Sequence, residues 1–498
     1  MIIQRLKMHL SDFKIPDLIL PENADEIPIK SITSDSRYST QDCMFIAIKG
    51  NNKDGHDYID EAISGGASNV LVDYKYKKLK GFPVAKAKNV RKALALISSI
   101  YYSKQPNTVA AVTGTNGKTS VCSFLNQIWK INKFKSASLG TLGLKSNPTL
   151  NSSKNIQNNL TTQDPVTLHN CISELKLKGI DLLALEASSH GLEQHRLDGV
   201  KISLACFTNL SHDHLDYHKS IENYKNQKFR LFKELLQDGG TAVINIDDKY
   251  GKELSHMIKG RNINIVTYGK SKEAKWKIDE ILDINGYKTL AVSISGKKFV
   301  LSTALNSNFQ VLNVIAAAAL AVASGVSLDH ALNTLPNIVT PDGRMQELIS
   351  LKGAKIYIDF CHTPDALKNI LEEKNNSTGK VFLVIGCGGN RDTKKRKMIG
   401  KIASMYSYKS IITDDNPRNE NPKKIRSEIL DGGLKNKNNL IEIQDRKQAI
   451  KKVLEEAEIS DVVIIAGKGH EQFQIYNDKK IPHNDFEFCK SLISGGGL

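Results

Sequence analysis

The fold of this chain is decided by one stretch of its sequence, TVAAVTGTNGKTS at residues 108–120. Residues 108–112 form a short apolar run that predicts a buried strand, and a helical pattern begins at Lys118. Between them, Gly114 and Gly117 allow the backbone to curl, so that successive N–H groups can point at phosphate oxygens. A strand, a glycine turn and a helix in this order predict a phosphate-binding loop.

The polar residues of this loop have expected tasks. Lys118 would neutralise the β- and γ-phosphates of ATP, and the hydroxyl of Thr119 would ligate Mg²⁺. The loop is a variant of the GxxxxGK(S/T) pattern, because Val112 stands in place of the first glycine. The expected ATP contacts are Gly114, Thr115, Asn116, Gly117, Lys118, Thr119 and Ser120.

Length and composition describe an ordinary globular protein. The chain has 498 residues, of which 40% are hydrophobic and 24% are charged, and this length predicts roughly two to four domains. Neither a signal peptide nor a run of about 18 apolar residues is evident, so we expect a cytoplasmic protein without a membrane span. The seven cysteines include no CxxC pair, which argues against a zinc site or a disulfide framework and favours buried thiols.

The net charge of +16 raises the question of nucleic-acid binding. The lysines are spread along the chain, however, and the densest basic run, 394–397, is short. No RNP, zinc-finger or helix-turn-helix signature accompanies it. A lysine-rich solvated surface is the favoured explanation, with anionic substrates accounting for part of the charge. A P-loop ATPase that binds nucleic acid stays open as an alternative of another class.

Three composition regimes predict three domains, at 1–106, 107–338 and 339–498. In the first, short strand-like runs at 43–48 and 69–72 are separated by polar turns. In the second and third, apolar strands alternate with helical patterns, which predicts an α/β fold with mainly parallel sheets. Those strands are expected at 180–185, 202–207, 241–246 and 262–268, and then at 355–359, 380–385, 410–413 and 461–466.

Two helices and the strand ends complete this pattern. An Ala-rich run at 314–323 predicts a buried helix, and residues 446–458 have the apolar stripe of an amphipathic helix. Nearly every strand of the second and third regimes ends in a glycine-rich or charged cluster. Because ligands bind at the carboxyl ends of strands in open α/β sheets, these clusters are candidates for one shared site or two facing sites.

The loop sequence TGTNGKTS resembles that of the Mur ligases and their folylpolyglutamate synthetase relatives. The similarity extends almost end to end, from Asp35-Ser36-Arg37 to GKGHE at 467–471. It implies an N-terminal α/β domain that binds the UDP end of a substrate, a central P-loop ATPase domain with a mainly parallel sheet, and a Rossmann-like C-terminal domain that receives an amino acid.

The resemblance also implies the reaction. It would be an ATP-dependent, amide-bond-forming ligase reaction of peptidoglycan synthesis, carried out in the cytoplasm by a monomer with two Mg²⁺ ions. The implied substrates are UDP-N-acetylmuramoyl-L-alanyl-D-glutamate and meso-2,6-diaminopimelate, joined through an acyl phosphate. Neither nucleic acid nor a membrane is an expected partner. A lysine-adding or other Mur-type or folylpolyglutamate-type ligase is the nearest alternative.

A second polar cluster follows two neighbouring strands. Glu186 ends one predicted strand, and His214 lies just beyond the next. A carboxylate and an imidazole at adjacent strand ends can hold Mg²⁺, but hard cations prefer oxygen, so a hydrogen-bonded structural histidine is the alternative.

The resemblance assigns this cluster a metal role. It implies that Glu186 and His214 are metal ligands and that Lys228 is carbamylated, which would turn its amine into an anionic oxygen ligand. Read alone, Lys228 would be a solvated surface lysine. The implied catalytic residues are Lys118, Lys228, His214 and Glu186. The implied metal ligands are Thr119, Glu186, His214 and Lys228 as its carbamate.

The sequence DDNPR at 414–418 follows another predicted strand. Pro417 would stiffen the turn, and the guanidinium of Arg418 offers two donors that suit a carboxylate, with a surface salt bridge as the alternative. In the family this arginine marks enzymes that use meso-diaminopimelate, whose distal carboxylate lysine lacks, and Glu471 would accept from the distal ammonium. The implied contacts to the amino acid are Arg391, Asp415, Asn416, Pro417, Arg418, Gly467 and Glu471.

Other positions resemble contacts to the remaining ligands. For the UDP-linked substrate they are Ser34 and Ser36 at the uridine, and Thr161, Thr162, Ser188, Gln194 and Arg196 at the muramoyl-dipeptide. Positions that resemble contacts to ATP or between the two domains are Asn313, Arg344, Asp359 and His362. Without the resemblance, Asn313 would be expected to cap the Ala-rich helix. The chain departs from the family pattern at Gln310 and Leu160, where relatives often have Asn.

Overall fold

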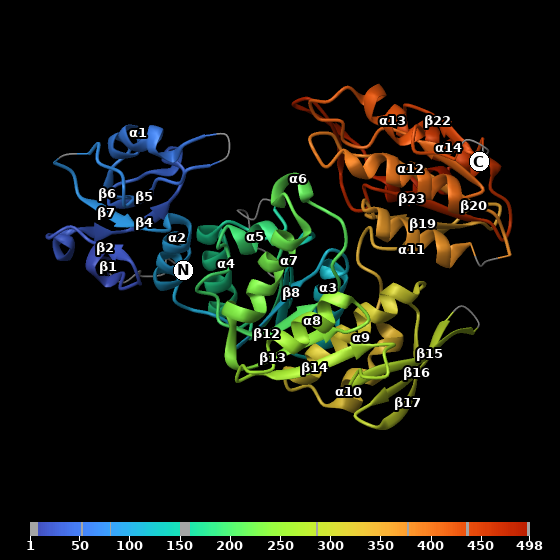
Figure 1. Cartoon of the computed structure of the whole chain (residues 1–498), viewed down its shortest axis with the longest axis horizontal. Helices are drawn as coiled ribbons and strands as arrows, with labels where there is room; N and C mark the ends of the chain where they lie inside the picture. The colour runs from blue at the N-terminus through green and yellow to red at the C-terminus, as the bar shows by residue number, and fades with distance from the viewer. Residues whose placement is uncertain are drawn as a thin grey trace. The chain divides into compact units, whose positions relative to one another are not determined.

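The computed structural model describes residues 8–50, 53–79, 81–149, 160–284, 287–375, 378–434 and 438–495, whose helices and strands are shown in Figure 1. The chain divides into two compact units. The first comprises Met1–Ala111, Phe134–Ser203 and Arg230–Asp238, and the second comprises Val112–Lys133, Leu204–Phe229 and Gly239–Leu498. The three-domain division with boundaries after residues 106 and 338 stays a prediction.

The N-terminal part of the first unit is a five-stranded sheet. Side chains alternate between the two faces of its strand β5. Met44 packs into the core that includes α2 (Val90–Tyr101), and Phe45 packs into the core that includes α1 (Ile59–Ser64). The strand order is β2 (Leu18–Ile19), β7 (Val84–Ala87), β6 (Ala67–Asp73), β5 (Cys43–Ile46) and β4 (Ser31–Thr33), parallel except between β2 and β7.

The remainder of the first unit positions the end of a buried strand. β11 (Leu182–Glu186) runs parallel to β9 (Ser136–Gly140), and β10 (Gly143–Asn147) pairs antiparallel with β9. β11 begins and ends slightly later than predicted, so that Glu186 is its last residue. The following helix, α5 (Ser189–Glu193), is capped by Ser188, whose hydroxyl accepts from the N–H of Gly191 at 3.1 Å.

The second unit contains the phosphate-binding loop, between the end of β8 (Thr108–Thr113) and helix α3 (Lys118–Ile131). α3 packs against α9 (Asn308–Ala323), the predicted Ala-rich helix, five of whose six alanines are buried. Asn313 lies inside α9, whereas Ser307 is the N-cap residue, so the alternative that Asn313 caps this helix is wrong.

Five strands follow in the second unit, and the last three were not predicted. β13 (Leu236–Asn245), β14 (Asn264–Gly269) and β15 (Trp276–Ile284) are parallel, whereas β16 (Tyr287–Ile294) and β17 (Lys297–Thr303) are antiparallel. In β16, Leu290, Val292 and Ile294 are buried and alternate with less buried residues. This period of two was a signal in the sequence that could have identified the strand.

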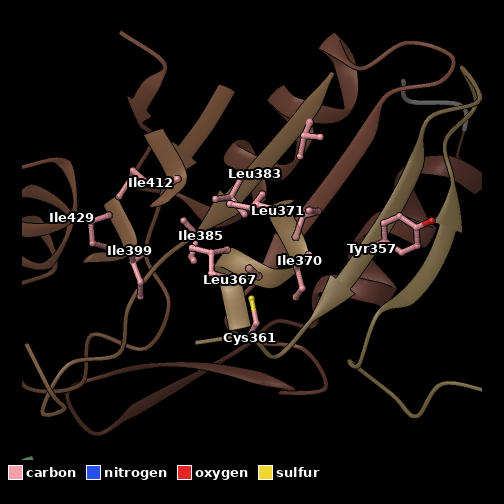
Figure 2. Packing of buried hydrophobic residues seen from close by; sticks show 14 of the residues in the cluster. Tyr357, Cys361, Leu367, Ile370, Leu371, Leu383, Ile385, Ile399, Ile412 and Ile429 are labelled. Atoms are coloured by element: carbon pink, nitrogen blue, oxygen red, sulfur yellow. The ribbon is translucent and has the colours of Figure 1, made fainter. Parts of the chain in front are cut away.

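The C-terminal part of the second unit is a six-stranded sheet with helices on both faces. Leu383 of β20 (Val381–Ile385) packs into the core that includes α11 (Pro364–Lys374) and α12 (Lys394–Tyr406), as Figure 2 shows. Its neighbour Val384 packs into the core that includes α14 (Arg446–Glu456). This doubly wound arrangement confirms the predicted Rossmann-like fold. The strand order is β18 (Gln346–Ile349), β19 (Lys355–Asp359), β23 (Val462–Ala466), β20 (Val381–Ile385), β21 (Lys409–Ile412) and β22 (Leu440–Glu442). β18 is antiparallel to β19, and the other pairs are parallel. The helices are α11 (Pro364–Lys374), α12 (Lys394–Tyr406), α13 (Pro422–Leu430), α14 (Arg446–Glu456) and α15 (Asp485–Ser494).

Helix α12 corrects the interpretation of the basic run 394–397 as solvated surface. Lys395 and Arg396 are buried, and the guanidinium of Arg396 pairs with Glu420 at 2.9 Å and with Glu428 at 2.7 Å. Half of the run therefore belongs to the interior of the C-terminal part.

Two further observations concern the whole described chain. None of the helices in its described residues is long and apolar enough to cross a membrane. The seven cysteines are all buried and carry free thiols, as predicted.

We expect Gly400→Ala to lower the melting temperature. A Cβ atom on Gly400 of α12 would lie 1.8 Å from the carbonyl oxygen of Ile429 on α13, so the two helices would have to separate. Overpacking of this kind costs about 1–3 kcal/mol. Differential scanning fluorimetry would measure the change, with Gly260→Ala as the matched control, since no heavy atom lies within 4 Å of a Cβ atom there. Equal melting temperatures for the two variants would contradict the close packing of α12 and α13.

Candidate active site

The two glycines of the phosphate-binding loop have backbone conformations that residues with side chains rarely adopt. φ is +148° at Gly114 and +89° at Gly117. A Cβ atom at Gly114 would lie 1.9 Å from Oγ1 of Thr208, and one at Gly117 would lie 2.5 Å from Oδ1 of Asn313. The loop therefore needs glycine at both positions, and Asn313, a predicted ATP contact, lies directly against it.

The segment after β12 (Ile202–Phe207) holds the loop in place. The N–H of Thr115 donates to the carbonyl oxygen of Asn209 at 2.8 Å, and the N–H of Asn116 donates to Oδ1 of the same residue at 2.9 Å. Asn209 was not among the predicted site residues. Its place just beyond the carboxyl end of a strand is the signal that could have identified it.

Lys118 and Thr119 both have hydrogen-bond partners at the loop, and their phosphate and Mg²⁺ roles stay predictions. Nζ of Lys118 donates to the carbonyl oxygens of Gly114 and Thr115, both at 2.8 Å, so the ammonium lies over the loop. Oγ1 of Thr119 accepts from Nη2 of Arg344 at 3.2 Å. The structure thus brings two of the predicted ATP-binding residues, Thr119 and Arg344, into contact.

Lys228 lies on α7 (Ile221–Arg230) and is only 1% exposed, so the alternative of a solvated surface lysine is wrong. Its Nζ donates to the carbonyl oxygen of Gly114 at 2.7 Å. Burial is the main cause that holds the pKa of Lys228 well below its ordinary value; the charge of Lys118 lowers it further, and Asp213 opposes both. A lowered pKa favours the uncharged amine, which is the form that can react with carbon dioxide.

Asp213 is a buried carboxylate between two histidines. Its Oδ2 lies 3.4 Å from Nε2 of His214 and 3.6 Å from Nε2 of His362. Burial would raise the pKa of Asp213, but the hydrogen bond with His362 and the charges of His214, His362 and Lys395 hold the pKa well below its ordinary value. His214 has a φ of +54°, a conformation that is rare outside glycine and common at functional sites. Two predicted site residues, His214 and His362, therefore meet at one anionic group.

Asp359, the remaining residue of that predicted group, supports the turn that precedes His362. Its Oδ2 accepts from the N–H of Met345 at 2.8 Å and its Oδ1 accepts from the N–H of Cys361 at 2.7 Å. Gln310, where the chain departs from the family pattern, accepts from Nδ2 of Asn313 at 3.1 Å.

Glu186 belongs to the first unit, where Thr141 donates to both of its carboxylate oxygens. The N–H of Thr141 bonds to Oε1 at 2.8 Å and the hydroxyl bonds to Oε2 at 3.0 Å. Among the residues that the structure describes, no group of three or more His, Cys, Asp or Glu side chains is arranged to hold a metal ion. The metal-ligand set therefore stays a prediction: Thr119, Glu186, His214 and Lys228 as its carbamate.

Thr162 connects the predicted muramoyl-dipeptide contacts of the first unit. Its hydroxyl donates to the carbonyl oxygen of Glu186 at 2.8 Å and lies 3.0 Å from the hydroxyl of Ser188. Nη1 of Arg196 donates to the carbonyl oxygen of Thr162 at 2.6 Å, and Nη2 donates to Oε1 of Gln194 at 2.8 Å. Four of the five predicted residues thus form one hydrogen-bonded group.

The fifth residue, Thr161, and Ser36 of the predicted uridine contacts each lie close to a polar partner. The hydroxyl of Thr161 lies 3.2 Å from that of Thr141. Ser36 is buried and donates to Oε2 of Glu61 at 2.8 Å, whereas Ser34 is exposed. Both serines follow β4, at the carboxyl end of that strand.

The predicted amino-acid site begins at Arg418, just after β21. Arg418 has a φ of +51°, and its N–H donates to the carbonyl oxygen of Ile475 on β24 (Phe473–Tyr476) at 2.9 Å, which holds this turn in place. Nη1 of Arg418 donates to the carbonyl oxygen of Gly389 at 2.9 Å. Burial lowers the pKa of Arg418, and repulsion from the charge of Arg391 lowers it further. Both side chains approach Gly388, where a Cβ atom would lie 2.8 Å from Nη1 of Arg418 and 3.9 Å from Cγ of Arg391. A carboxylate between them would relieve that repulsion.

Two carboxylates accompany this arginine pair. The charges of Asp415 and Glu471 both oppose the lowering of the pKa of Arg418. Asn416 links two of these residues, because its Nδ2 donates to Oε2 of Glu471 at 2.7 Å and its carbonyl oxygen accepts from Nη1 of Arg418 at 3.5 Å. Gly467 has a φ of +106°, and a Cβ atom there would lie 2.6 Å from Oδ2 of Asp415. The strand ends of the C-terminal sheet therefore present two positive and two negative groups together.

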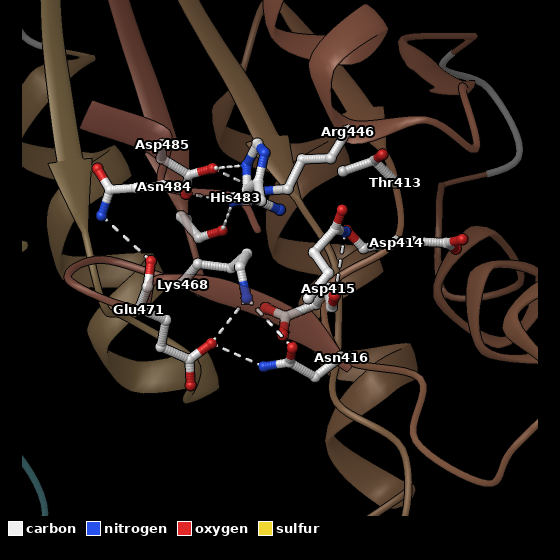
Figure 3. A network of polar contacts seen from close by, with 12 residues as sticks. Thr413, Asp414, Asp415, Asn416, Arg446, Lys468, Glu471, His483, Asn484 and Asp485 are labelled. Atoms are coloured by element: carbon white, nitrogen blue, oxygen red, sulfur yellow. Dashed lines mark hydrogen bonds and ion pairs between the residues drawn. The ribbon is translucent and has the colours of Figure 1, made fainter. Parts of the chain in front are cut away.

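Figure 3 shows the polar network behind Glu471. Its Oε2 accepts from Nδ2 of Asn416 at 2.7 Å and from Nζ of Lys468 at 2.8 Å. Pro417 is buried in the same turn. Lys468 was not a predicted site residue, although it lies within the GKGHE motif that carried the family resemblance.

Three family models match successive parts of the chain. They are described as Mur ligase family, catalytic domain, at residues 28–112; Mur ligase middle domain, at 112–321; and Mur ligase, glutamate ligase domain, at 343–469.

Proteins named UDP-N-acetylmuramoyl-L-alanyl-D-glutamate–2,6-diaminopimelate ligase are similar to almost the whole chain. The protein from Rhizobium meliloti (strain 1021) is 37% identical over 96% of this chain and 96% of its own length. The protein from Rickettsia conorii (strain ATCC VR-613 / Malish 7) is 36% identical over 93% of this chain and 96% of its own length.

Solved structures show the same likeness. One of an enzyme with that name is 29% identical, has a TM-score of 0.68, and covers 99% of this chain and 100% of its own. The MurF ligase from Thermotoga maritima in complex with ADP shares the fold, with 19% identity and a TM-score of 0.61 over 88% of this chain and 93% of its own.

We expect Gly117→Ala to weaken ATP binding at least about tenfold, a loss of about 1.4 kcal/mol, because the new methyl group would displace the loop or Asn313. Titration with a fluorescent ATP analogue would measure the dissociation constant. Gly239→Ala is the matched control, since Gly239 also has a positive φ, of +77°, but a Cβ atom there meets no heavy atom within 4 Å. Equal affinity in the two variants would show that the close approach to Asn313 does not shape the nucleotide site.

Proposed function

The chain belongs to the Mur ligase family, and we propose that it adds meso-2,6-diaminopimelate to UDP-N-acetylmuramoyl-L-alanyl-D-glutamate. The enzyme is an ATP-dependent, amide-bond-forming ligase of peptidoglycan precursor synthesis. One observation carries the choice of amino acid: the side chains of Arg391 and Arg418 both approach Gly388, where a Cβ atom would lie 3.9 Å from Cγ of Arg391 and 2.8 Å from Nη1 of Arg418.

The reaction needs an activated carboxylate. The carboxylate of the UDP-linked substrate attacks the γ-phosphorus of ATP, the bond to the β-phosphate oxygen breaks, and an acyl phosphate and ADP result. The amine of the diamino acid then attacks the acyl carbon. The bond between that carbon and the bridging oxygen breaks, so that inorganic phosphate leaves with this oxygen, and the nitrogen loses a proton. No nucleophilic side chain is required, because positioning and charge neutralisation carry such a transfer.

We assign the nucleotide to the loop before α3. The ammonium of Lys118 lies over this loop, and the N–H groups of a helix's first turn have no partners within the helix, so both can bind phosphate oxygens. Asn313 of α9 lies against Gly117 of the loop, and Arg344, from the segment before β18, donates to Thr119 in the first turn of α3. These contacts support their assignment to ATP, together with Gly114, Thr115, Asn116, Gly117, Thr119 and Ser120.

Mg²⁺ fits the predicted ligands if Lys228 is carbamylated, because the carbamate supplies a hard anionic oxygen beside a hydroxyl and an imidazole. Thr119, Glu186, His214 and the carbamate of Lys228 would hold the ions, which would spread the charge of the transferring phosphoryl group. The support in this chain is the buried amine of Lys228, whose lowered pKa favours attack on carbon dioxide.

The amino-acid site suits a zwitterionic distal end. Arg391 and Arg418 would bind the distal carboxylate of meso-diaminopimelate, and Glu471 would accept from its distal ammonium. Lysine has the distal ammonium without the distal carboxylate, so the half-buried guanidinium of Arg418 and the exposed guanidinium of Arg391 would lack the charged partner that meso-diaminopimelate supplies. The turn residues Asp415, Asn416, Pro417 and Gly467 shape this site.

The UDP-linked substrate would use the first unit. The hydrogen-bonded group around Thr162 supports the assignment of the muramoyl-dipeptide to Thr161, Thr162, Ser188, Gln194 and Arg196. Ser34 and Ser36 would bind the uridine. Action in the cytoplasm and as a monomer stays a prediction. The densest basic run gives little support to the nucleic-acid alternative, because half of it is buried.

We expect the purified protein to release ADP and form a new amide with meso-diaminopimelate, but to turn over lysine at most poorly. Arg418→Met should lower kcat/KM for meso-diaminopimelate by about 100-fold or more, since charge-assisted bidentate bonds are worth about 3 kcal/mol. Coupled ADP release and mass spectrometry of the product would measure both. The KM for ATP in Arg418→Met serves as the internal control and should not change. Equal turnover of lysine by the natural chain would refute the assigned specificity.

We expect Lys228→Ala to abolish turnover, and a short-chain carboxylate such as acetate to restore part of it by supplying the missing oxygen ligand. Steady-state ADP release with increasing acetate would show the rescue. Lys225→Ala is the matched control on the same helix, because Lys225 is engaged in ion pairs with Glu222 and Glu253, at 2.9 Å and 2.7 Å, away from the loop. Full activity of Lys228→Ala without acetate would contradict the carbamate.

A further inference from the structure

Lys468 is a fully buried lysine at the end of the amino-acid site. It lies in the loop after β23, between two glycines with positive φ, and its side chain has an exposed fraction of 0%. Burial of an ammonium group is costly unless each of its donors finds an acceptor. Nζ of Lys468 has three: Phe473 carbonyl oxygen at 2.7 Å, Glu471 Oε2 at 2.8 Å and Asn416 Oδ1 at 3.2 Å.

The amide of Asn416 can take only one orientation in this network (Figure 3). Its Oδ1 accepts from Nζ of Lys468 at 3.2 Å and from the N–H of Ile475 at 3.0 Å. A flipped amide would turn its NH₂ group toward these two donors. Nδ2 must therefore point the other way, where it donates to Oε2 of Glu471 at 2.7 Å.

Both interactions act on the same oxygen of Glu471. Oε2 receives one hydrogen bond from Asn416 and one from Lys468, which leaves Oε1 as the oxygen that can accept from a ligand. The side chain of Glu471 is 31% exposed, in contrast to the buried lysine behind it. Asn416 also connects Glu471 to Arg418, because its carbonyl oxygen accepts from Nη1 of Arg418 at 3.5 Å.

We propose that Lys468 is a positioning residue for amino-acid selection: directly and through Asn416, it holds Oε2 of Glu471 so that Oε1 faces the distal ammonium of the incoming diamino acid. This inference rests on the proposed function. Lys468 contacts no substrate in this scheme, and its effect on the reaction passes through Glu471.

Lys468 has a structural contact as well, and the test must separate the two. Its bond to the carbonyl oxygen of Phe473 ties it to β24, the strand that holds Arg418. Loss of that bond alone would weaken binding of the distal carboxylate. Loss of the bond to Glu471 would weaken recognition of the distal ammonium.

The experiment compares two ligands and three variants. 2-Aminopimelate has the distal carboxylate of diaminopimelate but lacks the distal ammonium. We expect Lys468→Met to raise the KM for meso-diaminopimelate at least tenfold, with the KM values for 2-aminopimelate and ATP changed less than about twofold. Glu471→Gln should have the same pattern. The double variant should be no worse than Glu471→Gln alone, because Lys468 acts only through Glu471.

Lys409→Met is the matched control. Lys409 begins β21, at the opposite end of the strand from Arg418, and pairs with Glu456 on α14. Its replacement also removes a lysine ion pair from the C-terminal sheet, and should leave all three KM values unchanged. Melting temperatures of all variants would show that each is folded under assay conditions.

The outcomes are distinguishable. If the natural chain forms no amide with meso-diaminopimelate, the proposed function fails. If it does, the inference is overturned by an unchanged KM for meso-diaminopimelate in Lys468→Met, by an equal rise of the KM for 2-aminopimelate, or by additive effects in the double variant. If Lys468→Met does not fold, Asn416→Leu takes its place, because it removes the second hydrogen bond to Oε2 of Glu471. This variant must then raise the KM for meso-diaminopimelate but not that for 2-aminopimelate.

Discussion

A lysine ammonium withdrawn from water must find acceptors or lose its charge, and this constraint shapes both halves of the second unit. Lys228 meets it at the carbonyl oxygen of Gly114, inside the phosphate-binding loop, where its pKa is also strongly lowered. Lys468 meets it among Glu471, Asn416 and the backbone of β24. In each case the bonds that make burial tolerable also fix a loop that faces a substrate. The same hydrogen bonds therefore satisfy the buried ammonium and set the geometry of the site.

The sheets explain why these lysines lie where they do. Parallel strands bring their carboxyl ends to one edge, and the chain must turn sharply there. At such ends the backbone comes so close to its neighbours that a side chain cannot be accommodated, as at Gly114 beside Thr208 and at Gly467 beside Asp415. Charged residues next to these glycines are consequently held at short range from one another. The turns at the strand ends therefore contribute to ligand recognition as much as the charged side chains do, because they fix where those side chains lie.

Features encoded locally were predictable, and those that depend on distant packing were not. The strand, glycines and helix around Lys118 are contiguous, so the loop could be derived from sequence. The strands of the C-terminal sheet, which pack on a core at each face, were predictable from their apolar runs. Lys228 is different: in sequence it stands among polar residues on a helix, and only the fold shows that it is buried against Gly114. Arg396 was misjudged for the same reason, since its carboxylate partners are Glu420 and Glu428, far along the chain. The specific roles of the site residues came from family resemblance and were not derivable from spacing.

The shielding of the cysteines has a practical consequence for following this enzyme at work. Burial raises the pKa of Cys206 and Cys361, and raises the pKa of Cys171 and Cys387 to about 12. Alkylating reagents react with the thiolate, so the natural chain offers maleimide dyes little background. One cysteine introduced at an exposed position can therefore be labelled with a fluorophore, and the native cysteines need not be replaced. Movements during turnover become measurable by fluorescence without first re-engineering the interior.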